Sequence, residues 1–195
     1  MVPPVDGPDG LPPVAGLFGK LPAHGDFVRR GWPDATVDAV DRWLTETIGT
    51  ARAARADADF AAWMRGAPLW RGYVPPGKLG PYALHLAVAP SVDRAGRLFP
   101  VAAGVAGSAG LAWAHAEQAG ELVDAAIYRA LAGDADADAA VGMISASLNS
   151  LNIDDGEDQG PGISAWWLEH DGAPIVASET VDSALLERLL CEGQA

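Results

Sequence analysis

Glycine and proline divide this sequence into short apolar segments and longer segments whose apolar residues recur at helical spacing. A chain patterned in this way buries both kinds of segment by packing helices against a sheet, so the alternation is the strongest constraint on its fold. We therefore predict an α/β fold with a single compact domain. Its central sheet, mixed or mainly antiparallel, should contain about five strands covered by helices as a sandwich.

The predicted strands are short apolar runs that end at turn residues. They fall at residues 14–18, 82–89, 98–105, 163–168 and 174–177, and the last two form a hairpin that turns at Asp171 and Gly172. The predicted helices fall at residues 34–48, 56–65, 111–131, 136–148 and 180–190. Residues 1–13 are rich in proline and glycine and should form a flexible tail before one domain at residues 14–195.

Two further segments are predicted from their glycines and prolines. Residues 21–33 should form an ordered loop that contains short extended pieces. Residues 72–79 partly match a phosphate-binding loop, but Leu79 stands where that loop needs Ser or Thr. Pro75 and Pro76 also lack the backbone N–H groups that would hold a phosphate. We predict no nucleotide site here, and the run that precedes this segment is not predicted to be a strand.

Charge is distributed unevenly along the 195 residues, whose formal net charge is −13. Residues 1–97 carry 11 Lys or Arg against 10 Asp or Glu, a net of +1, whereas residues 98–195 carry 2 against 16, a net of −14. Such an acidic half repels phosphate and anionic lipid, which argues against nucleic acid binding and membrane-surface binding. The acidity either maintains solubility or forms a face for a basic partner.

The expected compartment is the cytoplasm. The N-terminus lacks the basic start and apolar run of a signal peptide, and no stretch of eighteen apolar residues would span a membrane. A lone cysteine, Cys191, excludes an intramolecular disulfide and a cysteine-rich zinc site.

Residues able to bind a metal ion are dispersed. The four histidines lack metal-ligand spacing, and His85 is interpreted as a residue of the core or of a strand face. The acidic run that begins at Asp134 lacks the glycine and the final glutamate of a calcium loop, so it is interpreted as a helix start. We expect no metal, no cofactor and no enzyme activity.

Two charged segments, at residues 19–27 and 91–100, stand out. They contribute Lys20 and Asp26 from the first, and Asp93, Arg94 and Arg97 from the second. One interpretation is a partner-binding site where two ordered loops converge, with Arg94 and Arg97 recognising a carboxylate or phosphate. The other is an internal network in which Asp26 or Asp93 pairs with Arg94 or Arg97 and fixes the loops.

Two adjacent tryptophans, Trp166 and Trp167, should point to opposite faces of their strand. One is predicted to lie in the core and the other to be partly exposed, and we take Trp167 as a candidate interface anchor.

The motifs also carry a family resemblance. The string GLFGKLPAHGDFVRRG at residues 16–31 is followed by APLWRG at 67–72, PSVDRAGRLFPV at 90–101 and SAWW at 164–167. Their content and order resemble the TagF family of accessory proteins of bacterial type VI secretion, over nearly the whole chain. The resemblance implies a compact α/β fold and no family catalytic residues to transfer.

What the resemblance implies about function is a post-translational negative regulator of type VI secretion. Such a regulator would bind the forkhead-associated scaffold protein of the pathway that licenses assembly. Two alternatives remain: a structural or accessory subunit of the secretion machine, and an enzyme with an unrecognised site at Lys20, Asp26 and Arg94.

Overall fold

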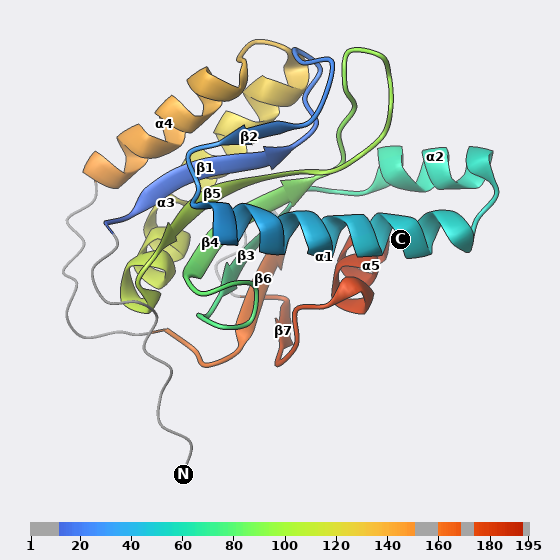
Figure 1. The fold of residues 1–195 in the computed structure, drawn as a ribbon. Helices are drawn as coiled ribbons and strands as arrows, with labels where there is room; N and C mark the ends of the chain where they lie inside the picture. Colours follow the sequence, from blue (N-terminus) through green and yellow to red (C-terminus); the bar gives the residue numbers. More distant parts are fainter. Residues whose placement is uncertain (1–11, 151–159, 169–173, 193–195) are drawn as a thin grey trace.

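A seven-stranded antiparallel sheet forms the centre of the protein, as seen in the computed structural model (Figure 1). The structure describes residues 12–150, 160–168 and 174–192. The strands are β1 (Val14–Gly19), β2 (Val28–Arg30), β3 (Trp70–Val74), β4 (Ala83–Ala89), β5 (Val101–Gly107), β6 (Ser164–Leu168) and β7 (Val176–Ser178). They lie in the order β2-β1-β5-β4-β3-β6-β7. The predicted α/β class and single sheet are confirmed, and the sheet has two strands more than expected.

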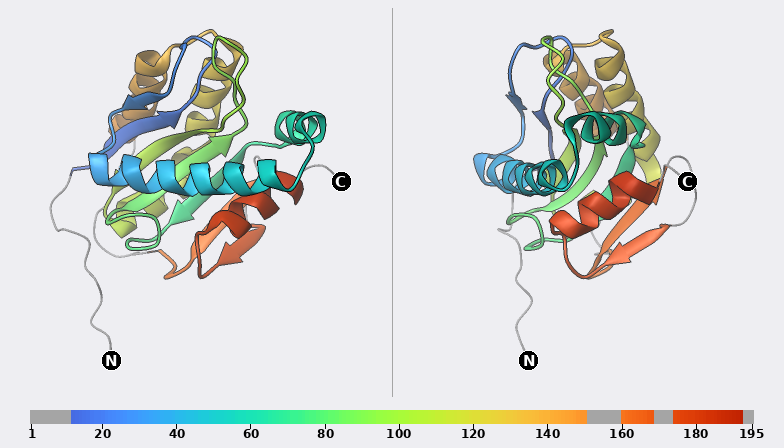
Figure 2. Two further views of the ribbon diagram at one scale, coloured as in Figure 1. Left: turned by 45° about the vertical axis from the view of Figure 1, so that its right-hand side comes forward. Right: turned by 90° about the vertical axis from the view of Figure 1, so that its right-hand side faces the viewer.

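Five helices cover the two faces of the sheet. They are α1 (Asp34–Ala53), α2 (Asp57–Gly66), α3 (Ala109–Ala132), α4 (Ala137–Ser150) and α5 (Ser183–Glu192). Helices α1, α2 and α5 lie on one face, and α3 and α4 lie on the other (Figure 2). Each face therefore has its own apolar core, as the predicted sandwich requires. Among the described residues, no helix combines the length and apolar character needed to cross a membrane.

Strand β3 was absent from the prediction, because Arg71 and Gly72 interrupt the apolar pattern of its five residues. Both residues are explained by their neighbours in the folded protein. A Cβ at Gly72 would collide with the ring of Trp166 on β6, so this position has no space for a side chain. Arg71 points to the opposite face, where its Nη1 lies 3.3 Å from Asp124 Oδ2 on α3. The fold pairs the strand's charge inside the protein, which the sequence pattern does not reveal.

The remaining comparison with the predicted elements concerns β2 and the hairpin of β6 and β7. Strand β2 lies within the segment predicted as an ordered loop with extended pieces, and it pairs with β1 from Leu17↔Arg30 to Gly19↔Val28. Strands β6 and β7 pair antiparallel, as the hairpin prediction requires. The predicted turn at Asp171 and Gly172 lies outside the described residues, as do residues 1–11 of the predicted tail.

Both neighbouring tryptophans of β6 are buried. Trp166 packs in the core under α1 and α5, and Trp167 packs on the opposite face, so the predicted alternation is confirmed. The predicted partial exposure was wrong, because Trp167 is only 5% exposed. Helix α3 covers it, with the Trp113 ring centroid 5.9 Å away. Trp167 in this structure is a core residue, which removes the basis for an interface anchor.

Candidate functional site

The two charged segments meet because their flanking strands are neighbours in the sheet. Residues 20–27 connect β1 to β2, and residues 90–100 connect β4 to β5. Since β5 pairs with both β1 and β4, the two connections emerge at the same end of the sheet. Gly19 allows the close approach: its φ is 135°, and a Cβ there would collide with the backbone of Pro100. The convergence predicted from the motifs is therefore present.

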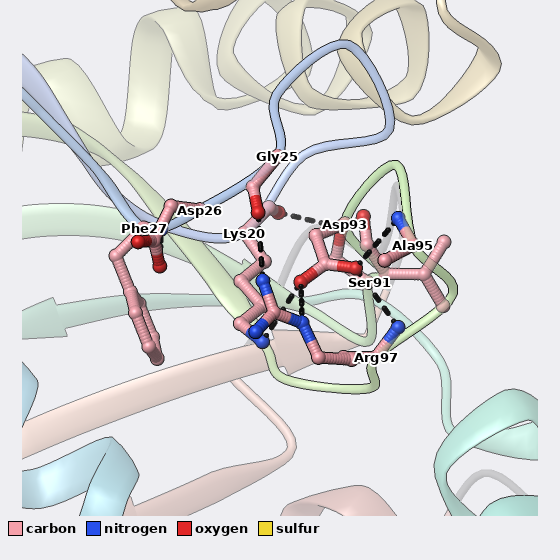
Figure 3. Close-up of polar contacts among 9 residues, drawn as sticks. Lys20, Gly25, Asp26, Phe27, Ser91, Asp93, Ala95 and Arg97 are labelled. Carbon is pink, nitrogen blue, oxygen red and sulfur yellow. Dashed lines mark hydrogen bonds and ion pairs between the residues drawn. The ribbon is translucent and has the colours of Figure 1, made fainter.

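The carboxylate of Asp93 is the centre of this loop pair (Figure 3). Its Oδ2 accepts hydrogen bonds from Lys20 Nζ at 3.0 Å and from Arg97 Nε at 2.6 Å. The Asp93 side chain is fully buried and that of Lys20 is 8% exposed, whereas that of Arg97 is 58% exposed. One buried negative charge thus faces two positive charges, one of which reaches solvent. Charge-assisted hydrogen bonds of this kind are the strong class, and they hold both loops to one point.

Asp93 also fixes the conformation of its own turn. Its Oδ1 accepts hydrogen bonds from the backbone N–H groups of Ala95 and Arg97, both at 2.9 Å. Gly96 provides the left-handed residue of the turn, with a φ of 79°. The Arg97 Nη2 then donates to the Gly25 carbonyl at 2.7 Å, which joins this turn to the first loop. The same residue therefore closes the turn and connects the loops.

A second set of hydrogen bonds ties the loops together through their backbones. Ser91 Oγ donates to the Lys20 carbonyl at 2.7 Å. Arg94 N–H donates to the His24 carbonyl at 2.8 Å, and Arg94 Nη2 donates to the Ala23 carbonyl at 3.0 Å. The His24 ring in turn accepts the N–H of Ala137 at 3.3 Å, at the start of α4. The loop pair is consequently anchored to the helical layer as well as to the sheet.

The electrostatic environment keeps Asp93 ionised. Burial alone would raise the pKa of this carboxyl group, because the charged form loses its hydration. Hydrogen bonds from the Arg97 backbone and from the Lys20 and Arg97 side chains outweigh that effect, and the pKa of Asp93 lies well below its usual value of 3.8. Asp93 is therefore a permanent anion in the physiological range and acts as an acceptor.

Asp26 and Arg94 do not join the Asp93 carboxylate. Asp26 is exposed, and its Oδ1 accepts the N–H of Phe27 at 2.8 Å, as in a turn that a side chain stabilises locally. Arg94 is exposed and donates to backbone carbonyls only. Of the predicted pairings, Asp93 with Arg97 is present. Lys20, Asp26 and Arg94 share one end of the sheet, but of these three Lys20 alone bonds to the Asp93 carboxylate, while Arg94 bonds to a backbone carbonyl and Asp26 to a backbone N–H.

Aromatic residues support the loop pair from beneath. Phe27 stacks on Phe18 with 5.8 Å between ring centroids, and its edge meets Phe99 at 4.8 Å. Lys20 Nζ lies 5.0 Å from the centroid of the Phe27 ring. Phe27 is nevertheless 45% exposed. The loops thus present one aromatic face to solvent that three other side chains hold in place.

Sequence reasoning missed a buried polar set on the face covered by α3. His85 on β4 and His115 on α3 place their Nδ1 atoms 2.6 Å apart, and His115 Nε2 lies 2.9 Å from Ser147 Oγ on α4. The interpretation of His85 as a core residue is confirmed, since both rings are completely buried. Its partner lies 30 residues away, and nothing in the spacing of the two histidines indicated the pairing. No group of three or more metal-binding side chains occurs within the described ranges.

The family model of the TagF N-terminal domain, described as type VI secretion system-associated, matches residues 16–151. The match covers more than half of the chain and contains both charged segments. The class of protein is therefore one associated with type VI secretion. Within that class, the chain belongs to the TagF family.

A solved structure is similar in fold. The crystal structure of PA0076 from Pseudomonas aeruginosa PAO1 superposes with a TM-score of 0.70 at 26% sequence identity, over 90% of this chain and 93% of that chain. Both proteins thus share their fold over most of their length. No protein in the curated collections matches the sequence significantly.

Proposed function

We propose that this protein is a non-enzymatic negative regulator of type VI secretion, which acts by binding the forkhead-associated scaffold protein of the secretion pathway. Membership of the TagF family provides the biological setting. The observation that carries the proposal is how the site uses its charges. Lys20, Asp93 and Arg97 satisfy one another in a fixed network, and this favours a rigid display surface over a reactive centre.

The absence of free reactive groups among the motif residues supports binding over chemistry. A general acid or base needs a pKa near the working pH and access to a substrate. Asp93 instead has a strongly lowered pKa and a fully buried side chain. Asp26 is exposed and bonded to the neighbouring backbone N–H. The residues of the alternative enzyme site thus serve the loop structure, in agreement with a role in recognition.

Preorganisation is what such a network contributes to binding. An ordered loop pays little conformational entropy when a partner docks on it, so a modest contact area still yields useful affinity. Here four hydrogen bonds to Asp93 and two bonds from the Arg94 and Arg97 side chains to backbone carbonyls hold the two loops. Arg94, Arg97 and Phe27 then face solvent from a fixed frame.

The first test is calorimetric titration of the full chain with the forkhead-associated scaffold encoded in the same gene cluster, at two salt concentrations. We expect saturable one-to-one binding that weakens as salt rises, because the exposed charges contribute to it. Arg94→Ala should weaken binding, and Arg42→Ala should leave it unchanged, since Arg42 is an exposed residue of α1 outside the loop pair. Absence of binding between two folded proteins would refute the proposed partner.

The second test separates a regulator from a structural subunit. Deleting the gene should increase secretion if the protein restrains assembly, and overproducing it should decrease secretion. Loss of secretion on deletion would instead support a structural or accessory subunit. Whichever way deletion changes secretion, reintroducing the wild-type gene into the deletion strain should restore the original level, and this is the control.

A further inference from the structure

An apolar groove opens beside the Asp93 loop, at the end of the sheet where α2 and α3 finish. Its volume is about 240 Å³, and its lining includes Pro22, Met64, Arg65, Val92, Leu98 and Leu131. These residues come from the first loop, the last turn of α2, both sides of the second loop and the last turn of α3. The groove is therefore assembled by tertiary structure from four separated parts of the chain.

The groove has a fixed shape on the side of the Asp93 loop. Val92 and Leu98 form an isolated β-bridge, which holds the two sides of this loop opposite each other. Asp93 closes the turn between them through its bonds to Ala95 and Arg97. Met64 is fully buried and supports the groove from the α2 side. A groove whose walls are held in this way offers a preformed place for an apolar side chain.

Three arginines border the groove. Arg65 lines it, and Arg94 and Arg97 project from the turn between Val92 and Leu98. All three are exposed, and within the described part of the chain Arg65 and Arg94 make no ion pair. This positive rim occurs on a chain whose net charge is −13, so it differs in sign from the molecule as a whole.

Three acidic residues near this end of the sheet have partners within the protein. Asp93 is bonded by Lys20 and Arg97. Asp138, in the first turn of α4, pairs with Arg30, and Asp136, just before α4, accepts the N–H of Ala139. Arg97 is bonded to Asp93, whereas Arg65 and Arg94 have no carboxylate partner among the described residues. Guanidinium groups bind carboxylates well in bidentate geometry, so Arg65 and Arg94 are suited to carboxylates from outside the protein.

We propose that this groove is the docking site for an acidic segment of a partner protein, which inserts one apolar side chain between Val92, Leu98 and Leu131 while its carboxylates meet Arg65 and Arg94. The size of the groove fits this occupant. A cavity of about 150 Å³ holds a benzene-sized group, so about 240 Å³ accommodates one large apolar side chain with part of its backbone. Drug-sized ligands occupy roughly 300–1,000 Å³, so a small-molecule substrate fits less well.

That the partner is the forkhead-associated scaffold rests on the proposed function, whereas the chemistry of the segment rests on the groove alone. The direct probe is therefore a panel of synthetic acidic peptides, each with a single central Leu, Met or Phe. Two matched panels replace the central residue by Ala or the acidic residues by Lys. Isotope-labelled full-length protein is titrated with each peptide, and backbone amide shifts are followed by NMR.

We expect the acidic apolar peptides to shift amides of residues 64–65, 91–98 and 131. The Ala and Lys panels should bind much more weakly. Arg65→Glu should lower affinity by about tenfold, since a rim charge becomes repulsive. Arg42→Glu is the matched control, an exposed arginine on α1 with the same change of charge, and it should bind as the wild type does. Shifts that gather elsewhere, or equal binding by the Ala panel, would overturn the proposal.

The same pair of variants is then titrated with the scaffold. Binding that Arg65→Glu weakens and Arg42→Glu preserves supports both proposals. Scaffold binding that neither variant changes, with a silent peptide panel, overturns the groove proposal and leaves the proposed function standing. If the peptides bind and the scaffold does not, the groove proposal stands and the proposed scaffold partner is overturned. Sedimentation is measured on the same variants. A wild-type dimer that Arg65→Glu dissociates would overturn the groove proposal, because a second copy of this chain would then occupy the groove.

Discussion

Acidification should destabilise this protein through the buried histidine pair, before its carboxylates become protonated. Ser147 Oγ donates its proton to the Ile144 carbonyl at 2.7 Å, so it accepts a hydrogen bond from His115 Nε2–H. His115 Nδ1 is then an acceptor, and His85 Nδ1–H donates to it at 2.6 Å. Protonation of His115 Nδ1 would place two N–H groups head to head in a buried site.

The sign of the pH dependence follows from the pKa values. Burial lowers the pKa of His115 from 6.5 to about 4. Burial, and then the neighbouring His115 and Arg71, hold the pKa of His85 well below 6.5. The unfolded chain therefore binds protons that the folded protein does not, in the range from about pH 6.5 down to about pH 4. Stability is complete above this window and falls as pH decreases through it.

The magnitude can be worked out for His115 alone. With a pKa of 6.5 unfolded and about 4 folded, linkage gives a loss of about 2 kcal/mol in the free energy of unfolding between pH 7.5 and pH 5. His85 contributes with the same sign. The measurement is urea unfolding, monitored by tryptophan fluorescence, at several pH values across this interval.

The control replaces both rings with leucine, His85→Leu together with His115→Leu. Ser147 keeps its bond to the Ile144 carbonyl, so the double variant leaves no newly orphaned partner at that hydroxyl. Replacing both members of a buried pair by apolar groups is often close to neutral, so the variant should fold. Its stability should be nearly independent of pH between 7.5 and 5. If the free energy of unfolding of the wild type changes with pH as little as that of the variant, the assigned protonation states are refuted.

Two further predictions concern the loop pair and the sheet. Asp93→Asn removes the counter-charge of two cations, so we expect a lower melting temperature and faster hydrogen exchange of the amides at residues 91–99. Unchanged exchange there would contradict the structural role of Asp93. Gly104→Ala should destabilise the protein by about 1–3 kcal/mol through overpacking, because its Cβ would collide with the backbone at His85. Gly142→Ala in α4 meets open space and should stabilise it by about 0.5–1 kcal/mol. Both variants are compared with the wild type by thermal unfolding. Equal changes in melting temperature would show that the collision at Gly104 does not determine the effect of its substitution.

Local patterning determined most of the elements. The apolar runs at β1, β4 and β5 and the helical spacing in all five helices are properties of neighbouring residues, which the sequence displays directly. The motif strings at residues 16–31 and 90–101 also predicted a convergence of loops and the TagF family. Both depend on residue order, and neither needs knowledge of distant contacts.

Tertiary structure decided the features that depend on residues far apart in the chain. Strand β3 is recognisable only when Trp166 fills the space above Gly72 and Asp124 neutralises Arg71. Trp167 is buried because α3 lies over it. The pairing of Asp93 with Lys20, and not with Arg94, depends on the antiparallel register of β1, β5 and β4. Burial and hydrogen bonding are set by three-dimensional packing, and one chain's residue order specifies that packing only through the fold as a whole.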